Sequence, residues 1–251
     1  MTVELLNSVM EIAQRMIEVG AEIHRVEDSV SRICRAYGVT RVDAYATTST
    51  IVVSVENADG NVLTQTRRVE STGTDIDRLD KLNALARRIT AQKPDAEQIQ
   101  KELDRIRPHM YPLWLQILSY GGIAAAFCLF FGGHTLAEVL VALVVGLIVG
   151  VIAKTLEHIA LNRILARFLC SFISAVMTFA AVRAGLIASP DNVIIGNIMT
   201  LIPGVGLTTS LRDLFVGDTV TGIMQSIEAV LLALAIASGY LLTALLFGGV
   251  A

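Results

Sequence analysis

The stretch that decides the fold is Asn192–Asp218, NVIIGNIMTLIPGVGLTTSLRDLFVGD. It begins as an apolar helix, but Pro203 removes a backbone donor and clashes with the preceding turn. Gly204 and Gly206 add backbone freedom directly after the proline. A helix broken within lipid needs protein or a water-filled cavity to satisfy its freed backbone groups, and such breaks form the substrate sites of many transporters. We therefore predict a substrate site here; the simpler alternative is a kinked helix that ends in a polar loop.

Polar residues on both sides of the break are the candidate contacts for a solute. Asn197 and Thr200 share a helix face before the proline. Arg212 follows it, and a guanidinium group matches a carboxylate bidentately. A structural ion pair of Arg212 with a nearby acid is the alternative. The predicted substrate-binding residues are Asn197, Thr200, Pro203, Gly204, Gly206, Thr208, Thr209 and Arg212.

Three carboxylates next to apolar sequence are candidates for proton coupling, namely Asp213, Asp218 and Glu228. A carboxylate in a membrane costs several kcal/mol unless it is paired or hydrated, so it points to function by default. Desolvation also moves the titration of a carboxyl group toward neutral pH. For Glu228 the alternative is a position near the lipid headgroups, where it pairs with Arg212.

The charge of the chain lies almost entirely in its first part. Residues 1–107 hold 15 of the 20 lysines and arginines and 17 of the 23 aspartates and glutamates. This division predicts a soluble domain followed by a membrane domain. The first part has no basic field, so nucleic acid is not an expected partner. Cys34, Cys128 and Cys170 have no metal-ligand spacing, and we predict neither a metal nor a cofactor.

Periodicity divides the first part into helices and strands. Apolar residues recur at helical spacing at both ends, and the period changes to two in a central region rich in Val, Ile and Thr. This predicts an α+β domain over residues 1–109. The expected helices cover residues 3–19, 22–37, 75–90 and 95–107, and the expected strands cover residues 41–47, 50–56 and 62–69.

The second helix carries a dense polar motif, Glu22, His24, Arg25, Glu27 and Asp28. A histidine beside two carboxylates suits a metal or acid–base site. A solvated face with weak ion pairs explains the same residues, and this helix has no third ligand at metal spacing. A contact between domains is a further possibility. No nucleophile–base pair accompanies the motif.

The second part reads as an α-helical membrane domain over residues 110–251. We predict five transmembrane helices, the fourth broken near Pro203, over residues 113–131, 136–152, 164–184, 193–211 and 222–247. Lysine and arginine flank the start of the first span and the link between the second and third. The positive-inside rule then places the N-terminal domain in the cytoplasm and the C-terminus outside. Gly146 and Gly150 suit a close helix contact.

Two motifs resemble those of the threonine/serine exporter family, in particular the larger subunit of its two-component form. One is Gly20-Ala21-Glu22-Ile23-His24-Arg25-Val26-Glu27-Asp28. The other is Pro203-Gly204-Val205-Gly206-Leu207-Thr208, followed by Arg212-Asp213-Leu214 and Gly217-Asp218.

The resemblance implies an inner-membrane secondary transporter subunit that exports threonine, serine or a dicarboxylate such as succinate, driven by the proton gradient. Fused members of the family carry about ten spans, so the resemblance also implies a smaller membrane partner of the same family, or a homo-oligomer, in membrane lipid. The alternatives are a membrane-anchored enzyme and a ligand-sensing regulator. Polar residues within the spans favour transport, because a simple anchor needs none.

Overall fold

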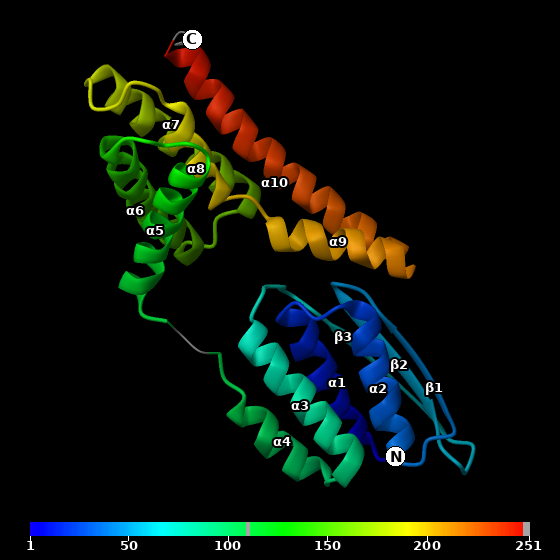
Figure 1. Cartoon of the computed structure of the whole chain (residues 1–251). Coiled ribbons are helices and arrows are strands. Elements are labelled where there is room, and N and C mark those ends of the chain that lie inside the picture. Colours follow the sequence, from blue (N-terminus) through cyan, green and yellow to red (C-terminus); the bar gives the residue numbers. More distant parts are fainter. Residues whose placement is uncertain (109–110, 248–251) are drawn as a thin grey trace. The chain divides into compact units, whose positions relative to one another are not determined.

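The computed structural model describes residues 1–108 and 111–247 (Figure 1). The chain forms two units: Met1–Met110 with Thr209–Met224, and Tyr111–Thr208 with Gln225–Ala251. The predicted domain boundary between residues 109 and 110 lies outside the described residues, as does the C-terminal residue, which we predict to be extracytoplasmic.

The first unit contains an α+β domain. Its elements are α1 (Val3–Glu18), α2 (Ile23–Ala36), β1 (Arg41–Ala46), β2 (Thr50–Glu56), β3 (Val62–Arg68), α3 (Ile76–Gln92) and α4 (Ala96–Arg105). Each matches a predicted helix or strand, with ends that differ by at most two residues. Asp75 and Asp95 accept backbone hydrogen bonds as N-caps of α3 and α4, which is why these two helices begin where they do.

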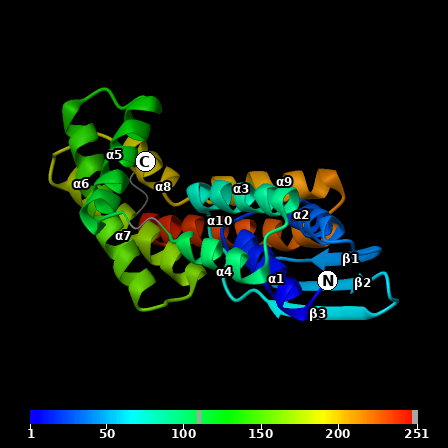
Figure 2. The same ribbon diagram turned by 90° about the horizontal axis from the view of Figure 1, so that it is seen from below.

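The three strands form one antiparallel sheet in the order β1-β2-β3. Val53 of β2 lies opposite Ala44 of β1 and Gln65 of β3. Alternation along β2 fully buries Ile51, Val53 and Val55. Helices α1 and α2 pack on the sheet, and α3 and α4 pack on these helices, so the domain has three layers (Figures 1 and 2).

The turn between α1 and α2 determines where the polar motif begins. Gly20 has a φ of +90°, a conformation that glycine adopts without strain. A Cβ on Gly20 would lie 2.7 Å from the carbonyl oxygen of Gly73. The Gly73 amide donates to Glu18 at 2.9 Å and the Asp75 amide donates to Val19 at 3.1 Å. The segment before α3 is thus fastened to this turn, and α2 starts directly after it.

The membrane part consists of helices joined by short links, with no strand among its described residues. It comprises α5 (Leu113–Phe130), α6 (Leu136–His158), α7 (Arg163–Arg183), α8 (Asp191–Met199), α9 (Gly204–Val216) and α10 (Thr219–Leu246). Helices α5, α6, α7 and α10 are long and apolar enough to cross a membrane. Helices α8 and α9 pass the same test together but are bent by 58°. Among the described residues there are therefore four candidate spans, or up to five if the bent pair counts as one, which fits an α-helical membrane protein.

Small residues allow three of these helices to pack closely. A Cβ on Gly146 of α6 would lie 2.9 Å from Cα of Gly121 in α5. A Cβ on Gly196 of α8 would lie 2.5 Å from the carbonyl oxygen of Ala124, also in α5. The predicted contact at Gly146 is thus present. Close approach through glycine is the usual way in which helices associate in lipid.

Helix α10 is joined to α7 by polar and close-packed contacts. The Ser171 hydroxyl donates to the carbonyl oxygen of Ile236 at 2.7 Å. A Cβ on Gly239 would lie 2.6 Å from the carbonyl oxygen of Phe168. Ser171 therefore bonds one helix to another, as buried hydroxyls in membranes often do.

Candidate functional site

The helix break occupies residues 200–203, between α8 and α9. Pro203 can donate no backbone hydrogen bond, and the chain bends here by 58°. Gly204 and Gly206 lie within α9 rather than in an unwound segment. The first turn of α9 is closed by the Leu207 amide, which donates to Pro203 at 3.0 Å. The break is therefore shorter than the glycine pattern suggests.

Asn197 lies in the last turn of α8, just before the break. It is fully buried. Its Nδ2 donates to the carbonyl oxygen of Val193 at 2.9 Å and to that of Ala142 in α6 at 3.4 Å. Within the described residues its Oδ1 has no hydrogen-bond partner. An amide oxygen can accept hydrogen bonds, so this buried acceptor is unused.

The other predicted contacts do not form one cluster with Asn197. The Thr200 hydroxyl donates to the carbonyl oxygen of Asn197 at 2.7 Å, so these two are adjacent. The Thr208 hydroxyl bonds within its own helix, to the carbonyl oxygen of Gly204 at 2.9 Å. Thr209 and Arg212 belong to the first unit. The predicted set of residues is thus divided between the two units.

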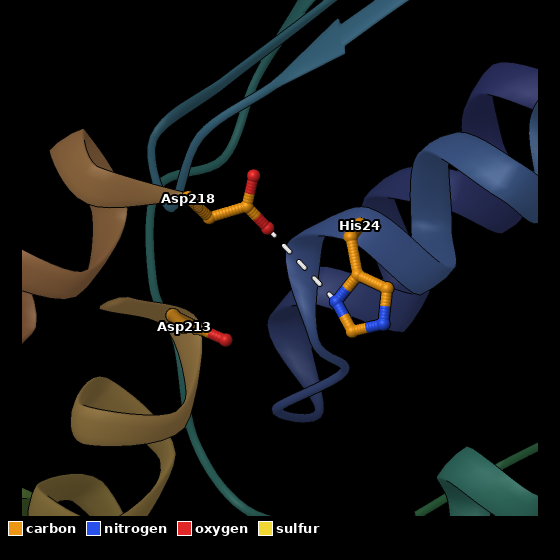
Figure 3. A group of neighbouring side chains, drawn as sticks. All are labelled: His24, Asp213 and Asp218. Carbon is orange, nitrogen blue, oxygen red and sulfur yellow. Dashed lines mark ion pairs between the residues drawn. The ribbon is translucent and has the colours of Figure 1, made fainter. Parts of the chain in front are cut away.

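The turn between α9 and α10 brings two acids to the start of α2. Asp218 Oδ2 lies 3.9 Å from Nδ1 of His24. Asp213 is 2% exposed. Figure 3 shows both carboxylates pointing toward the His24 ring. The three side chains each offer an oxygen or nitrogen atom within 4.8 Å of the other two. We call His24, Asp213 and Asp218 the His–Asp cluster.

Glu22 lies on the other side of the imidazole. Its Oε2 is 3.6 Å from Nε2 of His24, and its Oε1 forms an ion pair with Arg212. Arg212 therefore forms a structural ion pair, the alternative to substrate binding. Its partner is Glu22 and not Asp213, Asp218 or Glu228. Glu22 is 14% exposed and Arg212 is 58% exposed, so the pair lies at the edge of the cluster.

The rest of the α2 motif divides by exposure. Glu27 Oε1 accepts a hydrogen bond from the Ala46 amide at 2.7 Å and joins α2 to β1. Burial raises the pKa of Glu27, and the nearby charge of Asp218 raises it further, against the bond from Ala46. Arg25 and Asp28 are exposed, and Asp28 pairs with Arg32 at 2.7 Å. One side of the motif therefore contacts other elements, and the other is solvated.

Glu228 belongs to the second unit. Its Oε1 is 2.9 Å from Nη1 of Arg163, at the start of α7. The partner is therefore Arg163 and not Arg212. Both side chains are more than half exposed, so the pair joins the start of α7 to the first half of α10 at the surface of the helices.

Sequence spacing missed the His–Asp cluster. Helix α2 itself holds no third ligand at metal spacing, because the two acids come from a segment about 190 residues further along the chain. One signal was available, because His24 belongs to one of the two motifs that carry the family resemblance and both aspartates belong to the other.

Apolar spans, a broken helix pair with a buried asparagine and an α+β domain define a multi-pass membrane protein of the transporter class. The sequence profile of the ThrE family, described as "Putative threonine/serine exporter", matches residues 7–247. The chain belongs to this family.

Three curated proteins are similar to the chain over nearly its whole length. "Probable succinate transporter subunit YjjP" of Klebsiella aerogenes is 25% identical over 95% of this chain and 92% of its own. The protein of the same name in Escherichia coli is 25% identical over 93% and 91%. "Threonine/serine exporter" of Corynebacterium glutamicum is 22% identical over 94% of this chain but only 50% of its own. No solved structure shows a significant match.

Proposed function

We propose that the chain is a subunit of a proton-coupled secondary exporter in the inner membrane. Its substrate is a small carboxylate solute, with succinate the first candidate and threonine and serine the next. Succinate comes first because both relatives matched over more than nine tenths of their length bear that name. Threonine and serine remain candidates because of the similarity to the threonine/serine exporter of Corynebacterium glutamicum.

The observation that carries this proposal is the bent pair α8–α9 with Asn197 buried beside it. A break at membrane depth frees backbone groups, and half-helix ends offer dipoles to a charged solute. The unpartnered Oδ1 of Asn197 adds an acceptor at the same place. Arg212 is proposed as the carboxylate partner, and Asp213, Asp218 and Glu228 as the proton-coupling acids.

A second membrane subunit completes the proposed transporter. The chain aligns with half of the Corynebacterium exporter, and the succinate relatives are named as subunits. Half of a transporter exposes surfaces that lipid cannot match. We therefore propose a smaller partner of the same family. The alternative is an assembly of several copies of this chain. The oligomeric state of the purified complex distinguishes the two.

The N-terminal domain is proposed to be cytoplasmic. Lys154 and Arg163 flank the link between α6 and α7, as the positive-inside rule expects for a cytoplasmic loop. A cysteine replacing the turn residue Asn57 should resist an impermeant thiol reagent in intact cells and react after permeabilisation. The three native cysteines are buried and give a low background. Labelling of the Asn57→Cys variant in intact cells would reverse the orientation.

Export is tested in proteoliposomes that contain the chain with and without the smaller family member from the same cell. Labelled succinate, threonine and serine are supplied in turn under an imposed pH gradient. We expect one of them to be transported only when both proteins are present, and a protonophore to abolish that transport.

Two threonine variants test the position of the substrate site. Thr200→Val removes a hydroxyl next to Asn197 and should weaken transport. Thr155→Val removes a hydroxyl that bonds the carbonyl oxygen four residues earlier, at 2.9 Å in α6, and should not. Equal transport by the two variants would remove Thr200 from the site. Transport of none of the three solutes by the pair would refute the proposed function itself.

We propose that the chain itself catalyses no covalent reaction. The three relatives are named as transporters, and the His–Asp cluster includes no serine, cysteine or lysine that could act as a nucleophile.

A further inference from the structure

Four buried polar atoms without hydrogen-bond partners converge on one place in the first unit. They are Oε2 of Glu22, Nδ1 of His24, Oδ1 of Asp213 and Oδ2 of Asp218. The described residues contain only eight such side-chain atoms, so half of them gather here. A buried polar group without a partner destabilises the fold, and more so if it is charged. Such a concentration needs a compensating ligand.

Direct contact between these side chains does not supply that compensation. The separations of 3.9 Å from His24 to Asp218 and 3.6 Å from His24 to Glu22 exceed hydrogen-bond length. Asp213 is 98% buried, its Oδ1 has no hydrogen-bond partner, and its side chain points toward the imidazole (Figure 3). The ligand atoms therefore surround a point between them rather than bonding to one another.

The spacing suits a metal ion of small radius. Zinc binds imidazole nitrogen and carboxylate oxygen at about 2.0–2.2 Å, so two ligands of one tetrahedral ion lie roughly 3.4 Å apart. The three ligand atoms of the His–Asp cluster lie within 4.8 Å of one another. Side-chain rotations that bring each ligand atom inward by less than an ångström would place three ligands at coordination distance.

The surrounding charges favour a cation. Glu22, Glu27, Asp213 and Asp218 are four carboxylates, and Asp218 acts electrostatically on both Glu27 and Asp213. Arg212 forms its ion pair with Glu22, at the edge of the group. A divalent ion beside Asp213 and Asp218 would remove the repulsion between them.

Glu22 provides the support that metal-binding histidines usually have. With Nδ1 on the ion, the Nε2–H group of His24 would donate to Oε2 of Glu22, now 3.6 Å away. A carboxylate behind the imidazole fixes its tautomer and orientation and raises its basicity. Arg212 holds the other oxygen of Glu22, so the supporting carboxylate is itself positioned.

We propose that His24, Asp213 and Asp218 bind one divalent transition-metal ion, with Glu22 as the supporting carboxylate. One nitrogen and two oxygen ligands suit Zn²⁺ or Mn²⁺, and a water molecule or a further carboxylate can fill the remaining position. The ion fastens the turn between α9 and α10 to the start of α2. It thus joins the two motifs that carry the family resemblance. With Asp213 and Asp218 on the ion, Glu228 is the proposed coupling acid that is left to carry the proton.

Metal binding is measured on the full chain in lipid nanodiscs, stripped with a chelator and dialysed against Zn²⁺ or Mn²⁺. We expect one equivalent of Zn²⁺ or Mn²⁺ per chain. Co²⁺ should give a visible absorption band typical of nitrogen and oxygen ligands in a low-coordinate site. Glu22→Gln should weaken affinity about 10–100-fold, as loss of a supporting carboxylate does, and His24→Ala and Asp218→Asn should weaken it further.

Matched controls separate this site from adventitious binding. His158→Ala and Asp77→Asn make the same chemical changes at exposed positions outside the cluster and should bind like the wild type. Bound metal should also raise the melting temperature of the wild type but not that of His24→Ala. If a cluster variant does not fold, two measurements still test the proposal: the number of ions bound per wild-type chain and the metal affinity of Glu22→Gln. Less than one saturable equivalent on the folded wild type, or unchanged affinity in Glu22→Gln and His24→Ala, overturns the proposal, whatever transport shows.

Discussion

Replacing Gly196 by alanine tests the packing that holds the broken helix in place. Its added Cβ would lie 2.5 Å from the carbonyl oxygen of Ala124 and 2.8 Å from the amide nitrogen of Cys128. Both neighbours are backbone atoms of α5, so neither can move aside by a side-chain rotation. The matched control is Gly206→Ala in α9, where nothing lies within 4 Å of the added atom.

The two substitutions should change stability in opposite directions. Overpacking a well-packed contact costs about 1–3 kcal/mol, and Gly196→Ala should fall in this range because α8 must separate from α5. Gly206→Ala meets no obstacle and replaces a helical glycine, which should contribute about 0.5–1 kcal/mol. The variants should therefore differ from each other by about 1.5–4 kcal/mol.

The assay is reversible unfolding of the purified chain in mixed micelles, followed by circular dichroism and tryptophan fluorescence. Trp114 precedes the α5 contact with α8 by about ten residues and reports on the same helix. A Gly196→Ala variant as stable as the wild type would refute the close approach of α8 to α5. Similar destabilisation by Gly206→Ala would instead show that both glycines are needed for conformational freedom.

Three further predictions concern charged residues. Arg212→Lys should lower substrate affinity in a binding titration but change stability by less than about 1 kcal/mol, since exposed ion pairs contribute little; unchanged affinity would leave Arg212 with only its Glu22 pair. Glu228→Gln should abolish pH-driven export while binding persists, and full export would remove Glu228, with its Arg163 partner, from the coupling mechanism. Burial raises the pKa of Glu27, so its protonated form stabilises the fold at acidic pH and this contribution is lost as pH rises through that pKa. Glu27→Gln should therefore gain in melting temperature relative to the wild type as pH rises above the ordinary glutamate pKa of 4.5, and a constant difference would contradict this.

The elements of the fold were largely predictable because their signals are local. Periods of 3.6 and 2 predicted α1 to α4 and the three strands, and the apolar runs predicted four of the spans. Pro203 predicted a break between α8 and α9. The glycines after it suggested a longer unwound segment, but helix α9 begins at Gly204. A single glycine in an apolar helix costs only about 1 kcal/mol, which surrounding packing easily offsets.

The partners of the charged side chains were not predictable. Glu228 has Arg163 as its partner and Arg212 has Glu22, and each pair joins segments more than 60 residues apart. Sequence spacing identifies neighbours only within one helix or hairpin. The grouping of Thr209–Met224 with the N-terminal domain has the same origin, because it depends on tertiary contacts that leave no periodic signal.

The pairing of α5 with α6 has a consequence for how the protein is made. Only five residues separate the two helices, and Thr135 and Glu138 form a capping box that starts α6 at once. Their contact through Gly121 and Gly146 needs no later part of the chain. The two helices therefore have what they need to enter the bilayer as a hairpin while α7 to α10 are still being synthesised. A bulky residue at position 146 should accordingly reduce the amount of protein inserted in the membrane, before any effect on transport can be measured.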